Sequence, residues 1–226
     1  MRFFARAILL LMIVTPALAA PKAYHLELEA YPAAPFPFFS KFGSVDLHVY
    51  SGGVRADSFW LKGFSRNGSK TITAMNPVLR MYTDVPIADV QSIVSKLASS
   101  NPVAEGGPPP VQGPLRGKVG VLKASRYRLV YGPAAWIDLW TTTDIPTNPQ
   151  LRSIVDSLLR GISPLTANAA RNIPGTPVYV ELNFRRFQKV PLVKFKKLTF
   201  DNAGEADALK VGTLYFKAPL LDSIWR

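Results

Sequence analysis

Residues 177–200 constrain the fold most, because apolar and polar side chains alternate twice along this stretch. The apolar positions of its first half are Val178, Val180, Leu182 and Phe184, and those between them are Tyr179, Glu181, Asn183 and Arg185. Its second half alternates Val193 and Phe195 with Lys194 and Lys196. Since successive strand side chains point to opposite faces, the pattern predicts a long hairpin with one apolar and one solvent-facing, basic side. The break at residues 186–189 leaves the turn type open.

Short alternating segments run through most of the remaining chain. They predict strands at residues 24–30, 44–50, 53–61, 70–75, 78–83, 118–122, 125–131, 135–142 and 213–216. Turn-forming residues separate them, among them Gly52-Gly53 and Asn67-Gly68. Strands repeated about every ten residues indicate an antiparallel meander rather than βαβ units.

Two segments have apolar residues at helical spacing. Residues 88–99 and 148–159 predict amphipathic helices, the second with Asn148 as N-cap and Pro149 at the first helical position. Their central stripes comprise Ile93, Val94 and Leu97, and Ile154, Val155 and Leu158. A further helical turn is expected within residues 204–211, and an irregular segment over residues 162–175.

Residues 101–117 are rich in proline and glycine and predict a loop, but the strand pattern resumes after it. We therefore expect one domain over residues 21–226. The predicted fold is mainly β (α+β): a single curled antiparallel sheet, or half-barrel, with two or three short helices against its concave face.

The first 20 residues have the layout of a signal peptide. Arg2 and Arg6 precede the apolar run AILLLMIV, and a small-residue cleavage region follows. The run is too short to span a bilayer comfortably. With no cysteine in the chain, the sequence predicts export to a periplasm.

The chain carries a net charge of +12, from 27 Lys and Arg against 15 Asp and Glu. Behind a signal peptide this favours an anionic membrane surface or envelope polymer over nucleic acid as the acidic partner. Basicity that serves only solubility remains the alternative.

Catalytic chemistry is poorly supplied. Histidine occurs only at positions 25 and 48, cysteine is absent, and no nucleophile elbow, phosphate loop, dinucleotide fingerprint or zinc-protease motif is present. His25, Glu27 and Glu29 share one strand face, but solvent-facing strand residues explain them better than a metal. We expect a non-enzyme without cofactor or metal.

Two stretches carry a family resemblance. Residues 70–85 (KTITAMNPVLRMYTDV) and residues 127–199, from YRLVYG through the tryptophan-containing strand to KKLTF, resemble the envelope carrier superfamily of the LolA lipoprotein chaperone and the LppX/LprG lipid carriers, in its uncharacterised exported branch. The closing LYFKAP, residues 214–219, is similar to the family's terminal Phe-x-x-Pro. The resemblance implies a half-barrel with an acyl-chain cavity. The lipid-anchored cysteine of LppX has no counterpart here.

The expected function is that of a soluble periplasmic protein that binds or carries a lipid or acylated molecule. Ordinary core packing is the alternative for every apolar residue of the expected cavity. Its lining is assigned to Phe59, Leu129, Ile137, Leu139, Val178, Val180, Leu182, Phe184, Val193 and Phe195, beneath the two helix stripes. Anionic head groups are assigned to Arg185, Arg186, Lys189, Lys194, Lys196 and Lys197. The rival hypothesis is a non-catalytic envelope protein with a closed core, whose basic face docks a protein partner or an anionic polymer.

Overall fold

The computed structural model describes residues 23–30, 44–58, 61–98, 107–184, 187–200 and 205–219. Twelve strands lie within these ranges. They are β1 (Tyr24–Ala30), β2 (Ser44–Val49), β3 (Gly53–Asp57), β4 (Lys62–Arg66), β5 (Thr71–Asn76), β6 (Met81–Pro86), β7 (Val111–Val119), β8 (Leu122–Gly132), β9 (Ala135–Thr142), β10 (Thr176–Phe184), β11 (Phe187–Thr199) and β12 (Phe216–Lys217). The helices are α2 (Ile87–Ala98), α3 (Pro149–Ile162), α4 (Pro164–Ala170) and the single turn α5 (Glu205–Ala208).

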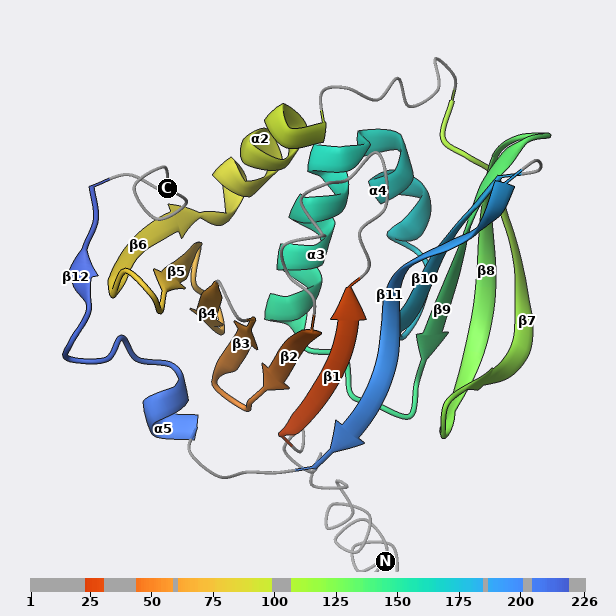
Figure 1. Ribbon diagram of the computed structural model, residues 1–226. Coiled ribbons are helices and arrows are strands. Elements are labelled where there is room, and N and C mark those ends of the chain that lie inside the picture. The colour runs from red at the N-terminus through yellow and green to blue at the C-terminus, as the bar shows by residue number, and fades with distance from the viewer. Residues whose placement is uncertain are drawn as a thin grey trace, which may run out of the picture.

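All twelve strands belong to one sheet, in the order β12-β6-β5-β4-β3-β2-β1-β11-β10-β9-β8-β7. Every neighbouring pair is antiparallel except β12 and β6, which are parallel. The sheet is strongly curled and does not close, as Figure 1 shows. The predicted fold class, a mainly β curled sheet with a few short helices, is confirmed.

The longer helices lie together on one side of the curled sheet (Figure 1), where α2 packs along α3. Helix α3 begins as predicted: Asn148 is its N-cap, with the side-chain oxygen accepting from the backbone N–H groups of Gln150 and Leu151. Leu151 and Ile154 of α3 then pack against the largest apolar core. Among the described residues, no helix is long and apolar enough to cross a bilayer.

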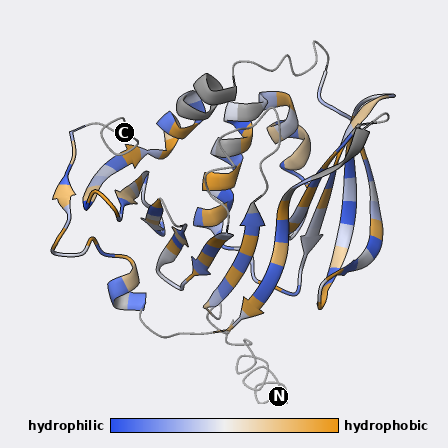
Figure 2. Cartoon of the chain, in the orientation of Figure 1, coloured by the Kyte–Doolittle hydropathy of each residue, from blue (hydrophilic) through white to orange (hydrophobic). Residues whose placement is uncertain are grey.

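The largest core forms where β1, β2 and β11 meet α3. Tyr24 and Leu26 of β1 are 2 % and 0 % exposed, and they pack in one cluster with Val178 of β10 and Phe195 of β11. Figure 2 shows the alternation of apolar and polar residues along these strands that makes one face available for burial.

Two predicted strand boundaries are wrong because the side chains of Ser58 and Asn76 form hydrogen-bonded turns there. The segment 53–61 divides after β3, where the N–H and the hydroxyl of Ser58 both donate to the carbonyl of Leu61 at 2.8 Å. The segment 78–83 begins as a turn, and β6 starts only at Met81. The chain from 53 to 66 therefore holds two strands, β3 and β4.

The predicted boundaries between residues 101 and 122 are also wrong. Strand β7 already begins at Val111 within the predicted loop, and the predicted strand 118–122 covers the end of β7, the turn at residues 120–121 and the first residue of β8. Gly120 makes that turn with φ +57°, a conformation that favours glycine. Pro114 fits in β7 because this strand ends the sheet order, where a missing N–H costs little.

Helix α4 lies in the segment predicted to be irregular. Its N-cap Ser163 accepts from the N–H of Thr166 at 3.2 Å, and Pro164 occupies the first helical position. This Ser-Pro signal is equivalent to the Asn-Pro that predicts the start of α3, but the short apolar pattern after it hides the helix. The predicted strand 213–216 contributes only Phe216 to β12.

Candidate ligand-binding face

The registers of β8, β9, β10 and β11 place most of the predicted lining residues in two cross-strand rows. One row is Val193–Val180–Leu139, and the next is Leu182–Ile137–Leu129. Directly opposed residues share a face of the sheet. The sequence prediction that these side chains come together on one face is therefore met by the backbone pairing.

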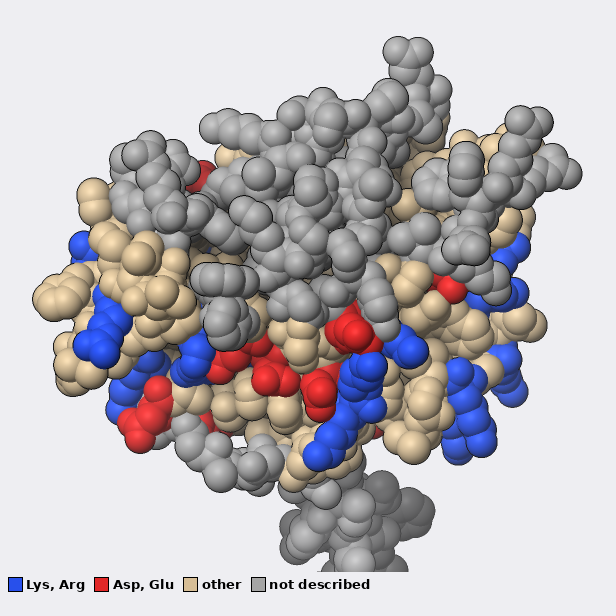
Figure 3. All heavy atoms as spheres, viewed as in Figure 1, with Lys and Arg blue, Asp and Glu red and all other residues tan. Residues whose placement is uncertain are grey.

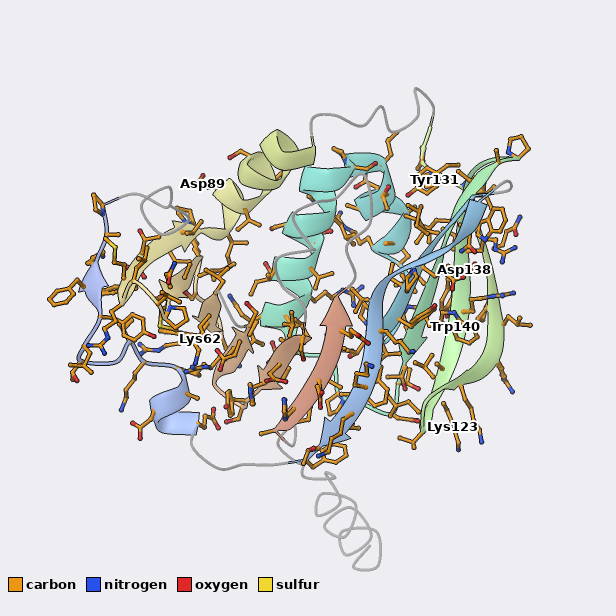
Figure 4. All side chains as sticks on the ribbon, in the orientation of Figure 1. Lys62, Asp89, Lys123, Tyr131, Asp138 and Trp140 are labelled. Carbon is orange, nitrogen blue, oxygen red and sulfur yellow. The ribbon has the colours of Figure 1, made fainter. Side chains whose placement is uncertain are left out.

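This face is the one that α4 covers. Two residues along β8 from Leu129, the hydroxyl of Tyr131 lies 2.5 Å from that of Thr166 in α4. Burial raises the pKa of Tyr131, and the bond to Thr166 offsets this only in part. Figure 4 shows Tyr131 at the end of β8 that lies towards α4.

Burial separates the predicted lining residues into two groups. Leu129, Val178 and Phe195 are 1 %, 0 % and 6 % exposed and belong to the closed core. The others whose side chains are described remain half-buried, and we call them the apolar strip: Ile137, Leu139, Val180, Leu182 and Val193. Among the predicted lining residues whose side chains are described, only those of the strip have apolar surface left to offer a ligand.

Several predicted residues lie outside the described part of the chain. They are Phe59, Arg185 and Arg186, together with the side chains of Phe184, Lys189, Ile93, Val94, Leu97 and Leu158. In the remaining helix stripe, Ile154 and Val155 are half-buried, and Ile154 packs on the core.

The opposite face of β8–β10 is not the solvent-facing side that the alternation predicted. Asp138, Glu181 and Asn183 are 4 %, 9 % and 2 % exposed. Asp138 accepts from Arg128 through both carboxylate oxygens, at 2.8 and 2.9 Å, and Asn183 donates to it at 3.5 Å. The prediction is wrong because these polar groups are buried in hydrogen-bonded pairs, and the hydropathy of single residues does not reveal such pairing.

Trp136 and Trp140 complete this polar face, as the register partners of Asn183 and Tyr179, and Figure 4 labels Trp140 and Asp138 on β9. The ring nitrogen of Trp136 donates to Asp138 at 3.3 Å, and the Arg128 guanidinium lies 4.9 Å from the Trp136 ring centroid. Arg126 lies 5.8 Å from the Trp140 ring. The bond to Asp138 raises the pKa of Arg128. Asp138 is thus engaged as the partner of a fixed cation.

The lysines assigned to anionic head groups are exposed but sit among carboxylates. Lys197 and Lys194 are register partners of Glu27 and Glu29, and the ammonium of Lys196 lies 2.6 Å from the Glu29 carboxylate. The cross-strand row continues from Glu27 through Asp46 to Asp57. Figure 3 shows carboxylates in the middle of this face with Lys and Arg to either side. The positive electrostatic field of these lysines is therefore weaker than the sequence suggested, because the neighbouring carboxylates offset their charge.

A shallow hollow of about 500 Å³ lies beside α5, lined by Gly52, Arg66, Glu205 and Leu209. Its polar groups are already paired: the Glu205 carboxylate accepts from the hydroxyl of Ser51 at 2.9 Å and from the Gly52 N–H. Within the described ranges, no group of three or more His, Asp or Glu side chains is arranged to hold a metal ion.

No family model matches the chain, and no curated protein does. Among solved structures, an uncharacterised conserved protein from Thermus thermophilus is similar over 88 % of this chain and 90 % of its own, with 6 % identity and a TM-score of 0.49.

Proposed function

We propose that the protein binds a lipid or another acyl-bearing molecule along the apolar strip. The supporting observation is that five aliphatic side chains from β9, β10 and β11, adjacent by register, remain half-buried beside a fully buried core. Binding sites for apolar ligands are typically lined in this way, with few polar groups. The chain resembles LolA-type carriers in the same region, which is a second reason for the proposal.

Export belongs to this proposal, with residues 1–20 as a cleaved signal peptide and the periplasm as the destination. The signal segment lies outside the described residues. The N-terminal mass of the protein recovered from a periplasmic fraction tests it directly. A chain that stays in the cytoplasm with an intact N-terminus would contradict this part.

The ligand proposal is tested by extracting the purified protein with organic solvent and analysing the extract by mass spectrometry. We expect a stoichiometric lipid or fatty acid. A fluorescent fatty acid supplies the second readout: it should bind with an emission increase and be displaced by unlabelled fatty acid. No lipid in the extract and no saturable probe binding would overturn the proposal.

A matched pair of variants locates the site. Val180→Trp enlarges a side chain of the strip and should weaken probe binding about tenfold or more by filling the space that an acyl chain occupies. Val121→Trp is the control, because Val121 is 85 % exposed and lies in the β7–β8 turn, outside the strip. Equal effects of the two substitutions would place the probe elsewhere.

The rival function, docking of an anionic polymer or protein through the basic face, rests on Lys194, Lys196 and Lys197. Loss of polymer binding in a triple Lys→Gln variant that retains lipid would favour it. The proposal that the protein is not an enzyme stands beside both functions and is open to activity screening.

A further inference from the structure

The turn between β5 and β6 is a rigid, exposed projection. The side-chain oxygen of Asn76 accepts from the N–H groups of Val78 and Leu79, both at 2.9 Å. Pro77 fixes one backbone angle, and Arg80 has φ +54°, which is uncommon for a residue other than glycine. The turn therefore holds its side chains in one arrangement instead of letting them collapse onto the sheet.

A distant part of the chain runs alongside this turn. Phe216 of β12 pairs with Met81, and its N–H donates to the carbonyl of Arg80 at 2.9 Å. Because the two segments are parallel, the residues before Phe216 lie beside the β5–β6 turn (Figure 1). The segment that carries Leu214 and Phe216 therefore runs beside the turn that carries Val78 and Leu79.

These four apolar side chains, which we call the apolar tip, all face solvent. Val78 is 61 % exposed, Leu79 45 %, Leu214 64 % and Phe216 73 %. A single exposed aliphatic residue is ordinary, whereas a cluster built from segments 135 residues apart marks an interaction site. Strand β12 and the β5–β6 turn carry apolar colour at this edge in Figure 2.

Cations border the apolar tip. Arg80 is part of the turn itself, and Lys217 follows Phe216, with its ammonium 2.9 Å from Asp84 and 6.0 Å from the Tyr82 ring centroid. Figure 3 shows Lys and Arg atoms around the left edge of the molecule, where β12 lies in Figure 1. The chain as a whole is strongly basic, at +12. Both the cations near the tip and the net charge of the chain favour a negatively charged partner.

We propose that the apolar tip docks the protein onto the surface of an anionic lipid bilayer. The four side chains enter the boundary between head groups and acyl chains, Arg80 meets lipid phosphates, and Lys217 with its partner Asp84 lies at the level of the head groups. Apolar groups flanked by Lys and Arg are the usual pattern of an interfacial anchor. A stable protein interface buries roughly 800 Å² on each partner, which a narrow projecting tip does not provide alone. This proposal does not depend on the apolar strip binding a ligand.

The test is co-sedimentation of the full chain with vesicles of phosphatidylglycerol and phosphatidylethanolamine, and with vesicles of phosphatidylcholine alone. We expect binding to the anionic vesicles that weakens as salt is added. The double variant Val78→Ser/Leu79→Ser should partition about tenfold less, because it removes about half of the apolar side chains that enter the bilayer. Arg80→Gly keeps the turn's backbone conformation and should weaken binding about fivefold at low salt.

The control is Val121→Ser, which removes an exposed valine at the other end of the sheet order. Its N-terminal segment is identical to that of the tip variants, so any membrane binding by that segment is the same in both. Equal loss in this control, or equal binding to phosphatidylcholine, would overturn the proposal. So would wild-type self-association through the tip without vesicle binding. Fatty-acid probe binding should be unchanged in Val78→Ser/Leu79→Ser, so that failure of docking is distinguished from failure of the ligand proposal.

Discussion

Arg128 and Asp138 face each other across β8 and β9 and form a two-bonded ion pair, with Nε–Oδ1 at 2.8 Å and Nη2–Oδ2 at 2.9 Å. Asp138 is almost fully buried, whereas the Arg128 side chain is 32 % exposed. A buried ion pair adds little to the free energy of unfolding, but removing one partner is strongly destabilising because the other charge stays buried and unpaired. The pair therefore fixes the register of β8 against β9, and β9 carries Ile137 and Leu139 of the apolar strip.

Asp138→Asn should lower the free energy of unfolding by about 2–3 kcal/mol, because it leaves the Arg128 charge beside a neutral amide that is a poorer acceptor. Urea unfolding followed by circular dichroism measures the change. Asp144→Asn is the matched control, since Asp144 is exposed and accepts one backbone N–H, from Lys123. The control should cost less than about 1 kcal/mol. Equal costs would mean that the buried pair has no special role.

The start of α3 offers a second stability test. Asn148→Ala removes the acceptor of the N–H groups of Gln150 and Leu151, at 2.8 and 3.0 Å, and should destabilise the protein by about 1 kcal/mol or slightly more. Asn148→Asp retains the acceptor and should cost clearly less. The two midpoints of urea unfolding should differ in this order, and a reversed order would contradict the capping role.

Helix α5 is attached to the sheet by contacts that can be tested locally. The Glu205 carboxylate binds Ser51 and Gly52, and Arg55 donates to the carbonyl of Ala208 at 2.8 Å. Glu205→Ala should raise the hydrogen-exchange rate of the Gly52 amide about tenfold, while global stability falls by no more than about 1 kcal/mol, because the site is near the surface. Asp207→Ala, which loses only an exposed pair with Lys210, is the control. Unchanged exchange at Gly52 would show that Glu205 does not hold it.

Sequence patterns predicted the parts of the fold that depend on periodicity and on strong caps. The hairpin of β10 and β11, helices α2 and α3 and the Asn148 cap follow from local signals that need no partner. Features set by distant contacts were missed. Glu181 and Asn183 read as solvent-facing because hydropathy cannot anticipate the buried Arg128–Asp138 pair.

The candidate site was predicted to the same extent. Alternation placed Val180, Leu182 and Val193 on one face, as the register has them. It could not separate the half-buried strip from Val178 and Phe195, which are buried because side chains of α3 and of the neighbouring part of the sheet pack in one cluster with them. The apolar tip could not be predicted from the sequence either, because the pairing of β12 with β6 joins segments that are far apart in the chain.

The stacked histidines on β1 and β2 predict a pH effect. His25 and His48 lie with ring centroids 4.2 Å apart, and burial, followed by the proximity of His25, lowers the pKa of His48 from its usual 6.5. The unfolded chain therefore binds a proton at His48 more readily than the folded chain does. Its contribution to stability is complete above about pH 7 and is lost as pH falls through 6.5 towards the lowered pKa.

Carboxylates titrate in the same direction, so the measurement compares His48→Gln with the wild type between pH 5 and 8. The stability of the wild type relative to this variant should be greater at pH 8 than at pH 5, because only the wild type carries the His48 contribution. In His25→Gln, an NMR titration should place the pKa of His48 closer to 6.5, since the neighbouring imidazole no longer opposes its protonation. Parallel pH profiles for His48→Gln and the wild type would show that His48 protonates equally easily in the folded and unfolded chains.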